Sequence, residues 1–278
     1  MSDKTRMVPL PSKAIVPERD VLEQPILEVS RLGINFGGLV AVEDFNIAVG
    51  RTEICGLIGP NGAGKTTIFN LLTKVYQPTS GAILLDGQDT ASMNTVQVNQ
   101  AGIARTFQNI RLFPSLSVED NVKIGLHNQV RYPLISGVFR LPGFFRAERQ
   151  AKVQAMELLS IFDMTDLASK KAGSLPYGAQ RRLEFLRALA TNPKLLLLDE
   201  PAAGMNPSET EELMASIKKI RDRFQIAIML IEHDMRLVMG ICEGIAVINY
   251  GKIIAKGTAS EIQDNPEVIE AYLGKKKE

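Results

Sequence analysis

A glycine-rich segment of nine residues separates two apolar stretches of different periodicity: Gly59-Pro60-Asn61-Gly62-Ala63-Gly64-Lys65-Thr66-Thr67. Glu53–Ile58 before it is strand-like, and Ile68–Leu72 after it has helical spacing. Glycines accept backbone angles that a Cβ disfavours, so successive N–H groups can point at phosphate oxygens. The following helix adds the positive end of its dipole. The pattern therefore predicts a phosphate-binding loop in an α/β fold.

Two residues of this loop have predicted roles of their own. Lys65 supplies a mobile cation for the β- and γ-phosphates, and the Thr66 hydroxyl is placed to ligate Mg²⁺. Kinases, GTPases, helicases and transporter ATPases all use such a loop, so the rest of the chain must distinguish among them.

The composition limits the other possibilities. The 278 residues are enough for one large α/β core and a smaller attached domain. A net charge of +1 gives no overall field for recruiting nucleic acid. Cys55 and Cys242 lie in apolar runs and are expected to be small buried hydrophobes. No apolar run reaches the ~18–20 residues of a membrane span, so we expect a cytosolic chain or one docked on the cytosolic side of a membrane.

Polar residues follow several strand-like runs at the point where each run ends. The apolar run Leu195–Leu198 is followed by Asp199 and Glu200, the strand-like run that ends at Ile231 by His233, and the one that ends at Phe107 by Gln108. A continuous apolar run fits a strand covered on both faces, as in a parallel sheet. Ligands of such sheets bind beyond the carboxyl ends of the strands. These groups and the glycine loop are therefore expected to converge on one pocket.

The residue types suggest a division of roles. Asp199 is expected to hold Mg²⁺, and Glu200 to position and polarise an attacking water. Gln108 can ligate Mg²⁺ or hold the water, and His233 is expected to contact the γ-phosphate. His127 is expected to be exposed. Phe36, in a turn between two strands, is either a core anchor or a platform for an adenine ring.

Several helices and one atypical stretch complete the pattern. We expect a capping box at Ser117 with a helix through Leu126, helices over 147–159 and 181–190, and a capping box of Ser208 and Glu211. The stretch 128–146 interleaves basic and aromatic residues. It is interpreted as a loop that packs on its own domain, with nucleic acid, a membrane or a partner protein as alternatives.

Taken together, the motifs resemble the ATP-binding subunit of an ABC transporter, over residue 25 to the C-terminus. Residues 59–67 resemble the Walker A motif, 175–180 the signature, and 195–199 the Walker B motif, with Glu200 directly after it. Gln108 corresponds to the Q-loop, His233 to the switch histidine and Phe36 to the adenine-stacking aromatic. Within that superfamily, stretches such as Glu200-Pro201-Ala202-Ala203-Gly204-Met205-Asn206-Pro207 and the ending Ala271-Tyr272-Leu273-Gly274 resemble the ATPase of branched-chain (hydrophobic) amino-acid importers.

The signature departs from the usual Leu-Ser-Gly-Gly-Gln. Pro176, Tyr177 and Ala179 replace the serine, the first glycine and the glutamine, so the serine hydroxyl that would touch the γ-phosphate is missing. Gly178 and the helix N-terminus after it can still offer N–H donors to the nucleotide. Asn206 stands where the D-loop usually has aspartate, and coupling between the two ATP sites is then expected to be weaker or asymmetric.

The resemblance implies a RecA-like P-loop core with an antiparallel β subdomain and a smaller helical domain that bears the signature. The expected organisation is a flexible arm over 1–24, an ATPase domain over 25–274 with the helical part at about 109–190, and a basic tail over 275–278.

It also implies ATP and Mg²⁺ as cofactors and ATP hydrolysis as the activity. The implied partners are a second, related ATPase subunit, two transmembrane permeases and, through them, a periplasmic binding protein, at the cytoplasmic face of the membrane and without nucleic acid. Another cargo, such as lipopolysaccharide, is the alternative; a soluble ABC ATPase and a P-loop kinase fit the motifs less well.

Overall fold

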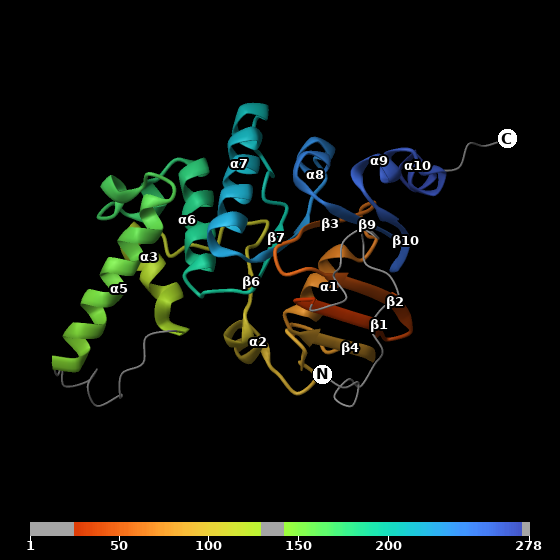
Figure 1. Cartoon of the computed structure of the whole chain (residues 1–278), viewed down its shortest axis with the longest axis horizontal. Helices are drawn as coiled ribbons and strands as arrows, with labels where there is room; N and C mark the ends of the chain where they lie inside the picture. Colours follow the sequence, from red (N-terminus) through yellow and green to blue (C-terminus); the bar gives the residue numbers. More distant parts are fainter. Residues whose placement is uncertain (1–24, 129–141, 274–278) are drawn as a thin grey trace. The chain divides into compact units, whose positions relative to one another are not determined.

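The computed structural model describes residues 25–128 and 142–273 (Figure 1). The arm over 1–24 and the tail over 275–278 lie outside the described residues. The chain divides into two compact units. The first combines Met1–Arg105 with Lys194–Glu278, and the second is Thr106–Pro193.

A six-stranded, mostly parallel sheet forms the centre of the first unit, in the order β10-β9-β3-β8-β7-β6. Its strands are β3 (Ile54–Ile58), β6 (Ile103–Arg105), β7 (Leu195–Asp199), β8 (Ala227–Ile231), β9 (Gly244–Asn249) and β10 (Lys252–Gly257). Only β10 pairs antiparallel. Every residue of β3, β7 and β8 is buried, which explains why these strands are continuous apolar runs.

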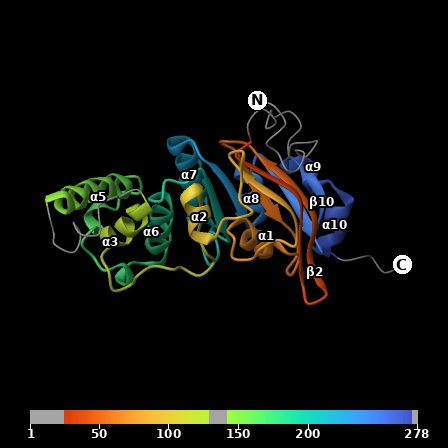
Figure 2. The ribbon, with the colours of Figure 1, turned by 90° about the horizontal axis from the view of Figure 1, so that it is seen from below.

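A four-stranded antiparallel sheet, in the order β2-β1-β4-β5, completes the β structure of this unit. It consists of β1 (Leu27–Phe36), β2 (Leu39–Val49), β4 (Ser80–Leu85) and β5 (Gln88–Asp89). Both sheets and the helix after the glycine loop contribute to one apolar core, with Phe45, Leu57 and Phe69 among its members. Strands β10 and β2 contact each other, so the two sheets meet at this edge (Figure 2). The predicted α/β class with an antiparallel β subdomain is confirmed.

The helices of the first unit follow the strands. They are α1 (Lys65–Leu72), α2 (Thr95–Ala101), α7 (Pro207–Phe224), α8 (Met235–Ile241), α9 (Ala259–Gln263) and α10 (Pro266–Leu273). The predicted cap of α7 is wrong: the capping box is formed by Asn206 and Glu209, two residues earlier than Ser208 and Glu211. Pro207 occupies the first helical position, where a backbone N–H would have no partner within the helix, so proline is tolerated there. The helix therefore starts earlier in the chain than predicted.

The second unit is helical. It contains α3 (Val118–Gly125), α5 (Pro142–Ser160) and α6 (Tyr177–Leu189), with short 3-10 turns η2 (Leu126–Asn128), η3 (Thr165–Leu167) and η4 (Ala172–Ser174). Two predicted helix starts are too late, since α5 begins at Pro142 and α6 at Tyr177. Residues 142–146, interpreted as part of a loop, are therefore helical, while 129–141 lie outside the described residues.

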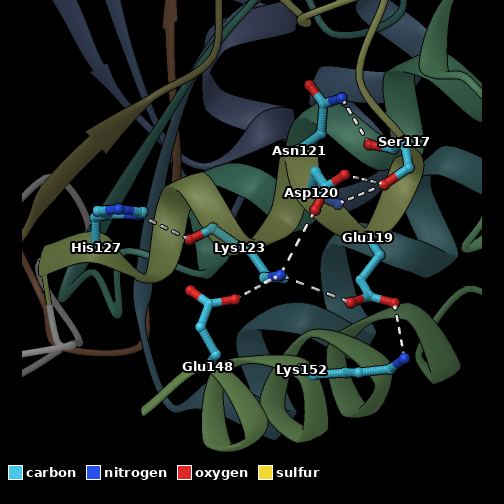
Figure 3. Close-up of polar contacts among 8 residues, drawn as sticks. All are labelled: Ser117, Glu119, Asp120, Asn121, Lys123, His127, Glu148 and Lys152. Carbon is cyan, nitrogen blue, oxygen red and sulfur yellow. Dashed lines mark hydrogen bonds and ion pairs between the residues drawn. The ribbon is translucent and has the colours of Figure 1, made fainter. Parts of the chain in front are cut away.

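Charged side chains join α3 and α5 (Figure 3). The Lys123 Nζ lies 3.0 Å from Glu148 Oε2 on α5 and 3.6 Å from Asp120 Oδ1 on its own helix. Burial alone lowers the pKa of Lys123, but the hydrogen bond with Glu148 and the neighbouring carboxylates raise it above its ordinary value. Ser117 caps α3 by accepting from the Asp120 N–H, but the Asp120 carboxylate accepts from the Ser117 hydroxyl and does not complete the predicted capping box. His127 is exposed, as predicted.

Other features of the described residues also match expectation. Cys55 and Cys242 are free and buried, and burial raises the pKa of both thiols. None of the helices in the described ranges combines the length and apolarity needed to cross a membrane.

Candidate nucleotide-binding and hydrolysis site

The glycine loop lies between the carboxyl end of β3 and the start of α1 at Lys65. Gly64 caps α1 with a φ of 106°, in the left-handed region. A Cβ at Gly59 would lie 2.0 Å from the Ile248 carbonyl oxygen of β9, a backbone atom that cannot move aside. On its outer side the loop is held by the Gly251 N–H, which donates to the Ala63 carbonyl at 2.9 Å. These contacts explain why glycines are required here.

Lys65 folds back over the loop. Its Nζ donates to the carbonyl oxygens of Gly59 at 2.7 Å and Pro60 at 2.9 Å. Burial lowers the pKa of Lys65, while the charges of Glu200 and Asp199 raise it. The ammonium group is thus held at the loop, with two acids near enough to favour its charged form. Thr66, the next residue, is exposed.

Asp199 ends β7 and is only 6% exposed. Its Oδ2 lies 2.6 Å from Nη2 of Arg105, the last residue of the neighbouring strand β6. The Arg105 Nη1 donates to Asn70 Oδ1 on α1 at 2.7 Å. Arg105 therefore connects the predicted metal ligand to the helix that follows the loop. Local sequence patterns could not single out Arg105, because it belongs to a short strand-like run and its partner is 94 residues away.

Glu200 and His233 face each other just beyond the adjacent strands β7 and β8. The His233 Nε2 lies 3.2 Å from Glu200 Oε1, and the side chains are 40% and 22% exposed respectively. Glu200 has a φ of 48°, which is unusual for a residue with a side chain. Its N–H donates to the Ile231 carbonyl at 2.9 Å. The structure thus brings together Lys65, Asp199, Glu200 and His233 at one edge of the sheet, with an acid and an imidazole open to solvent.

The donor set suits Mg²⁺ bound together with a nucleotide. No group of three or more histidine, cysteine, aspartate or glutamate residues within 25–128 and 142–273 could hold a metal ion. Mg²⁺ in nucleotide sites is held by one or two carboxylates, with phosphates and waters as the other ligands. Asp199, with Thr66 on α1, fits that arrangement.

Phe36 ends β1 and is 43% exposed, so it is not a core anchor. Tyr76, which follows α1, lies edge-on to it, with ring centroids 5.2 Å apart and an angle of 76° between the rings. The pair is an exposed aromatic surface in the same unit as the glycine loop.

A cavity of about 550 Å³ borders the loop at Pro60–Ala63, with Tyr250, Glu267 and Glu270 among its other lining residues. The carboxylates of Glu267 and Glu270 would repel a negatively charged triphosphate, so this cavity does not suit one. Tyr272 on α10 reaches this side of the loop: burial raises the pKa of its phenol, and a hydrogen bond with the Gly59 backbone lowers it.

Gln108 and Gly178 belong to the second unit. Arg181, only 1% exposed, donates to the Phe107 carbonyl at 2.7 Å and to the Gln108 carbonyl. It also pairs with Glu184 at 3.0 Å, so the backbone that carries Gln108 is fixed to α6. The roles of Gln108 and Gly178 toward a nucleotide stay predictions.

Gly178 is the second residue of α6, and a Cβ there would meet nothing within 4 Å. Its N–H is one of the helix donors without an intrahelical partner. Ala179 is buried, with only 6% of its surface exposed. A small apolar residue at this position agrees with that burial.

Comparison with known proteins gives a consistent result. A family model described as ABC transporter matches residues 42–203, and one described as branched-chain amino acid ATP-binding cassette transporter matches 252–278. The chain is 47% identical over 253 residues to the high-affinity branched-chain amino acid transport ATP-binding protein BraF of Pseudomonas aeruginosa, covering 91% of this chain and 99% of that protein. It is 46% identical over the same length and coverage to LivG of Escherichia coli, which carries the same description.

Solved structures agree on the fold. The ADP conformation of MJ1267, an ATP-binding cassette of an ABC transporter, has a TM-score of 0.78 and 28% identity, covering 90% of this chain and 99% of that one. With its loop, acids and histidine arranged as described, the chain belongs to the ATP-binding cassette family of ABC transporters.

Proposed function

We propose that this chain is the ATP-hydrolysing subunit of an importer for branched-chain amino acids. The observation that carries the proposal is the Lys65, Asp199, Glu200 and His233 constellation at one sheet edge, in a chain that matches BraF over 99% of that relative's length. The match of residues 252–278 to a branched-chain amino acid family supports the cargo.

Each residue of the site is proposed to make its own contact with the nucleotide or the metal ion. The loop N–H groups and the α1 N-terminus bind the phosphates, with Lys65 moving from the loop carbonyls to the β- and γ-phosphates. Phe36 stacks on the adenine ring. Mg²⁺, when bound, neutralises charge that develops on the transferred phosphoryl group. Asp199 and Thr66 would hold it, with Gln108 as a further ligand or water contact.

Glu200 and His233 carry the hydrolysis step. Glu200 orients a water and accepts its proton, while the His233 imidazole, 3.2 Å from Glu200, contacts the γ-phosphate. Because Glu200 is partly exposed, the water can reach it before a second subunit covers the site.

The assembly is inferred from the family. A second, related ATPase subunit contributes its signature helix, with the N–H groups near the equivalent of Gly178, to each nucleotide. ATP binds the closed pair better than the open one, and this difference drives closure. Two membrane-spanning permeases convert closure into transport at the cytoplasmic face of the membrane, and a periplasmic binding protein delivers the amino acid.

Glu200→Gln tests the role of the acid. The variant keeps the shape and the polar contact but cannot accept a proton, so ATP affinity should be retained. Hydrolysis should fall by about 10²–10⁴-fold, the usual contribution of general base catalysis. Phosphate release and equilibrium ATP binding are the measurements, with the exposed α7 residue changed in Glu211→Gln as the control. Normal turnover by Glu200→Gln contradicts the assignment.

The cargo needs a separate experiment. The chain is co-expressed with the two permeases of a branched-chain amino acid importer, and the purified complex is reconstituted in vesicles with the matching binding protein. Leucine, isoleucine or valine should stimulate ATP hydrolysis several-fold, whereas arginine or glutamate should not. Stimulation by an unrelated cargo alone would leave the ATPase assignment intact and overturn the importer assignment.

A further inference from the structure

Glu232 is a buried acid to which no role in the site has been assigned. It follows β8 directly and is 3% exposed. Its carboxylate accepts three backbone N–H groups. Oε1 accepts from Ala202 at 2.7 Å, and Oε2 accepts from His233 at 2.8 Å and Asp234 at 3.2 Å.

The three donors come from two separate segments of the site. Ala202 lies in the turn immediately after Glu200, whereas the other two donors begin the loop that carries the His233 imidazole. The Ala202 contact is 30 residues away in sequence and buried. The Glu232 carboxylate thus connects the turn that follows Glu200 to the backbone at His233.

The Glu200 backbone needs such support. Its φ of 48° is in the left-handed region, which is strained for a residue with a side chain. Its N–H is fixed by Ile231, and its carbonyl accepts from the Ala203 N–H at 3.2 Å. The Glu232 bond to Ala202 holds the same turn from its other side.

We infer that Glu232 is a positioning residue for hydrolysis, whose carboxylate sets the placement of Glu200 relative to His233. The inference rests on the roles proposed above for those two residues. A carboxylate is suited to this task because both of its oxygens accept only, and charge-assisted bonds to backbone N–H groups are about twice as strong as neutral ones. A glutamine offers one oxygen, and its NH₂ group would face a backbone donor on the other side.

Glu232→Gln therefore releases either Ala202 or the His233 loop. Losing a charge-assisted bond of about 1.5–3 kcal/mol at this point predicts a kcat for Mg²⁺-ATP hydrolysis lower by about 10- to 100-fold. The equilibrium Kd for ATP should stay within about twofold, because the hydrogen bonds that the Glu232 carboxylate accepts come from Ala202, His233 and Asp234 and not from the phosphate-binding N–H groups of the loop.

Glu53→Gln is the matched control. Glu53 is 2% exposed, precedes β3 at the far end of that strand from the loop, and accepts from the Gly50 N–H at 2.8 Å. Both variants remove a buried charge, so both are expected to lower the thermal midpoint of unfolding. Only Glu232→Gln should also lower kcat in protein that is folded at the assay temperature.

A double-mutant cycle separates positioning from general stability. In a His233→Ala background, measured by single-turnover hydrolysis, Glu232→Gln should change the rate by less than about threefold, since the pair it aligns no longer exists. The same 10-fold or larger loss in both backgrounds overturns the inference, as does a wild-type kcat in the single variant.

Two other experimental results have consequences of their own: a Glu232→Gln variant that does not fold, and a wild-type protein that does not hydrolyse ATP. If Glu232→Gln does not fold, Glu232→Asp takes its place, because it keeps the charge but is one methylene too short to reach both segments; the same split of kcat from Kd is expected, and a wild-type kcat overturns the inference. If the wild-type protein binds ATP without hydrolysing it, the proposed function fails and the positioning role fails with it. A wild type that hydrolyses ATP beside a Glu232→Gln variant with the same kcat overturns the positioning role alone.

Discussion

Arg105 and Asp199 form a buried ion pair at the carboxyl edge of the parallel sheet. The Nη2 and Oδ2 atoms lie 2.6 Å apart, and the side chains are 6% and 8% exposed. The Arg105 guanidinium also lies 5.5 Å from the Phe69 ring centroid, so α1 supports it. The pair thus holds the Asp199 carboxylate, proposed above as a metal ligand, in a fixed orientation next to α1.

Arg105→Met should destabilise the protein strongly. Removing one partner of a buried pair leaves the other charge uncompensated, which costs about 3–5 kcal/mol. The free energy of unfolding in urea measures the effect. Arg51→Met is the control, because Arg51 pairs with Asp86 at the surface with a side chain 47% exposed, and such pairs are worth about 0–1 kcal/mol. Equal losses in the two variants would contradict the importance of the Asp199 pair.

Phe36→Ala should weaken ATP binding without affecting the fold. Stacking of a base on an aromatic ring is worth about 1–3 kcal/mol, so the Kd should rise roughly 5- to 150-fold, measured by equilibrium binding. Phe36→Trp should keep the affinity. Leu39→Ala, in the same hairpin and 70% exposed, is the control and should leave the Kd unchanged. An unchanged Kd in Phe36→Ala would remove the adenine contact from the proposed site.

The sequence predicted most of the residues at the strand ends, because hydrophobic periodicity and the residue types of a loop are local features of the chain. Asp199 ends a buried strand, the glycine loop, Glu200 and His233 come after buried strands, and the parallel order then brings them to one edge. Arg105 and Glu232 escaped notice because their function depends on partners 94 and 30 residues away, on neighbouring strands and turns.

Helix boundaries were less predictable for a related reason. Ser208 and Glu211 have the spacing of a capping box, but so do Asn206 and Glu209, and Pro207 favours the earlier start. Similarly, Pro142 opens α5 although the composition of the preceding stretch suggested a loop. Where two capping boxes compete, the residue at the first helical position can decide between them, as Pro207 does here.

Gly59→Ala should abolish ATP binding. The added Cβ would lie 2.0 Å from the Ile248 carbonyl oxygen, so the loop or β9 must shift. The N–H groups of the loop would then no longer point together at the phosphates. Gly87→Ala is the control: it has a φ of 75° but nothing within 4 Å of the new Cβ. That variant should cost only about 1–3 kcal/mol of strain and leave the Kd unchanged. Retained ATP binding by Gly59→Ala would show that the loop tolerates the shift.

Asp86→Asn should change how stability depends on pH. The hydrogen bond from Lys194 at 2.6 Å, and that from Arg51, lower the pKa of Asp86 below its ordinary value. A lowered pKa in the folded state contributes stability above the unfolded pKa of about 4, and this contribution is lost as the pH falls through the folded value. The difference in unfolding free energy between wild type and Asp86→Asn, about 1 kcal/mol or less for a pair near the surface, should be constant from pH 7 to 5 and shrink below pH 4.

Gly178→Asp tests the signature helix in a chain that lacks the usual serine. Gly178 is the second residue of α6, with open space around its Cα, so the variant should fold. An acid in the first turn of a helix interacts favourably with the dipole, by about 0.3–1 kcal/mol. Stability should therefore be equal or slightly higher.

Hydrolysis should nevertheless fall, because the new carboxylate would repel the phosphate that the α6 N–H groups are proposed to meet in a second subunit. Gly143→Asp provides a close match, since Gly143 is the second residue of α5 and also has nothing within 4 Å of a Cβ. The two variants should have the same thermal midpoint, and only Gly178→Asp should lose ATPase activity and ATP-dependent association of subunits. If both retain activity, the N-terminus of α6 does not take part in the nucleotide site.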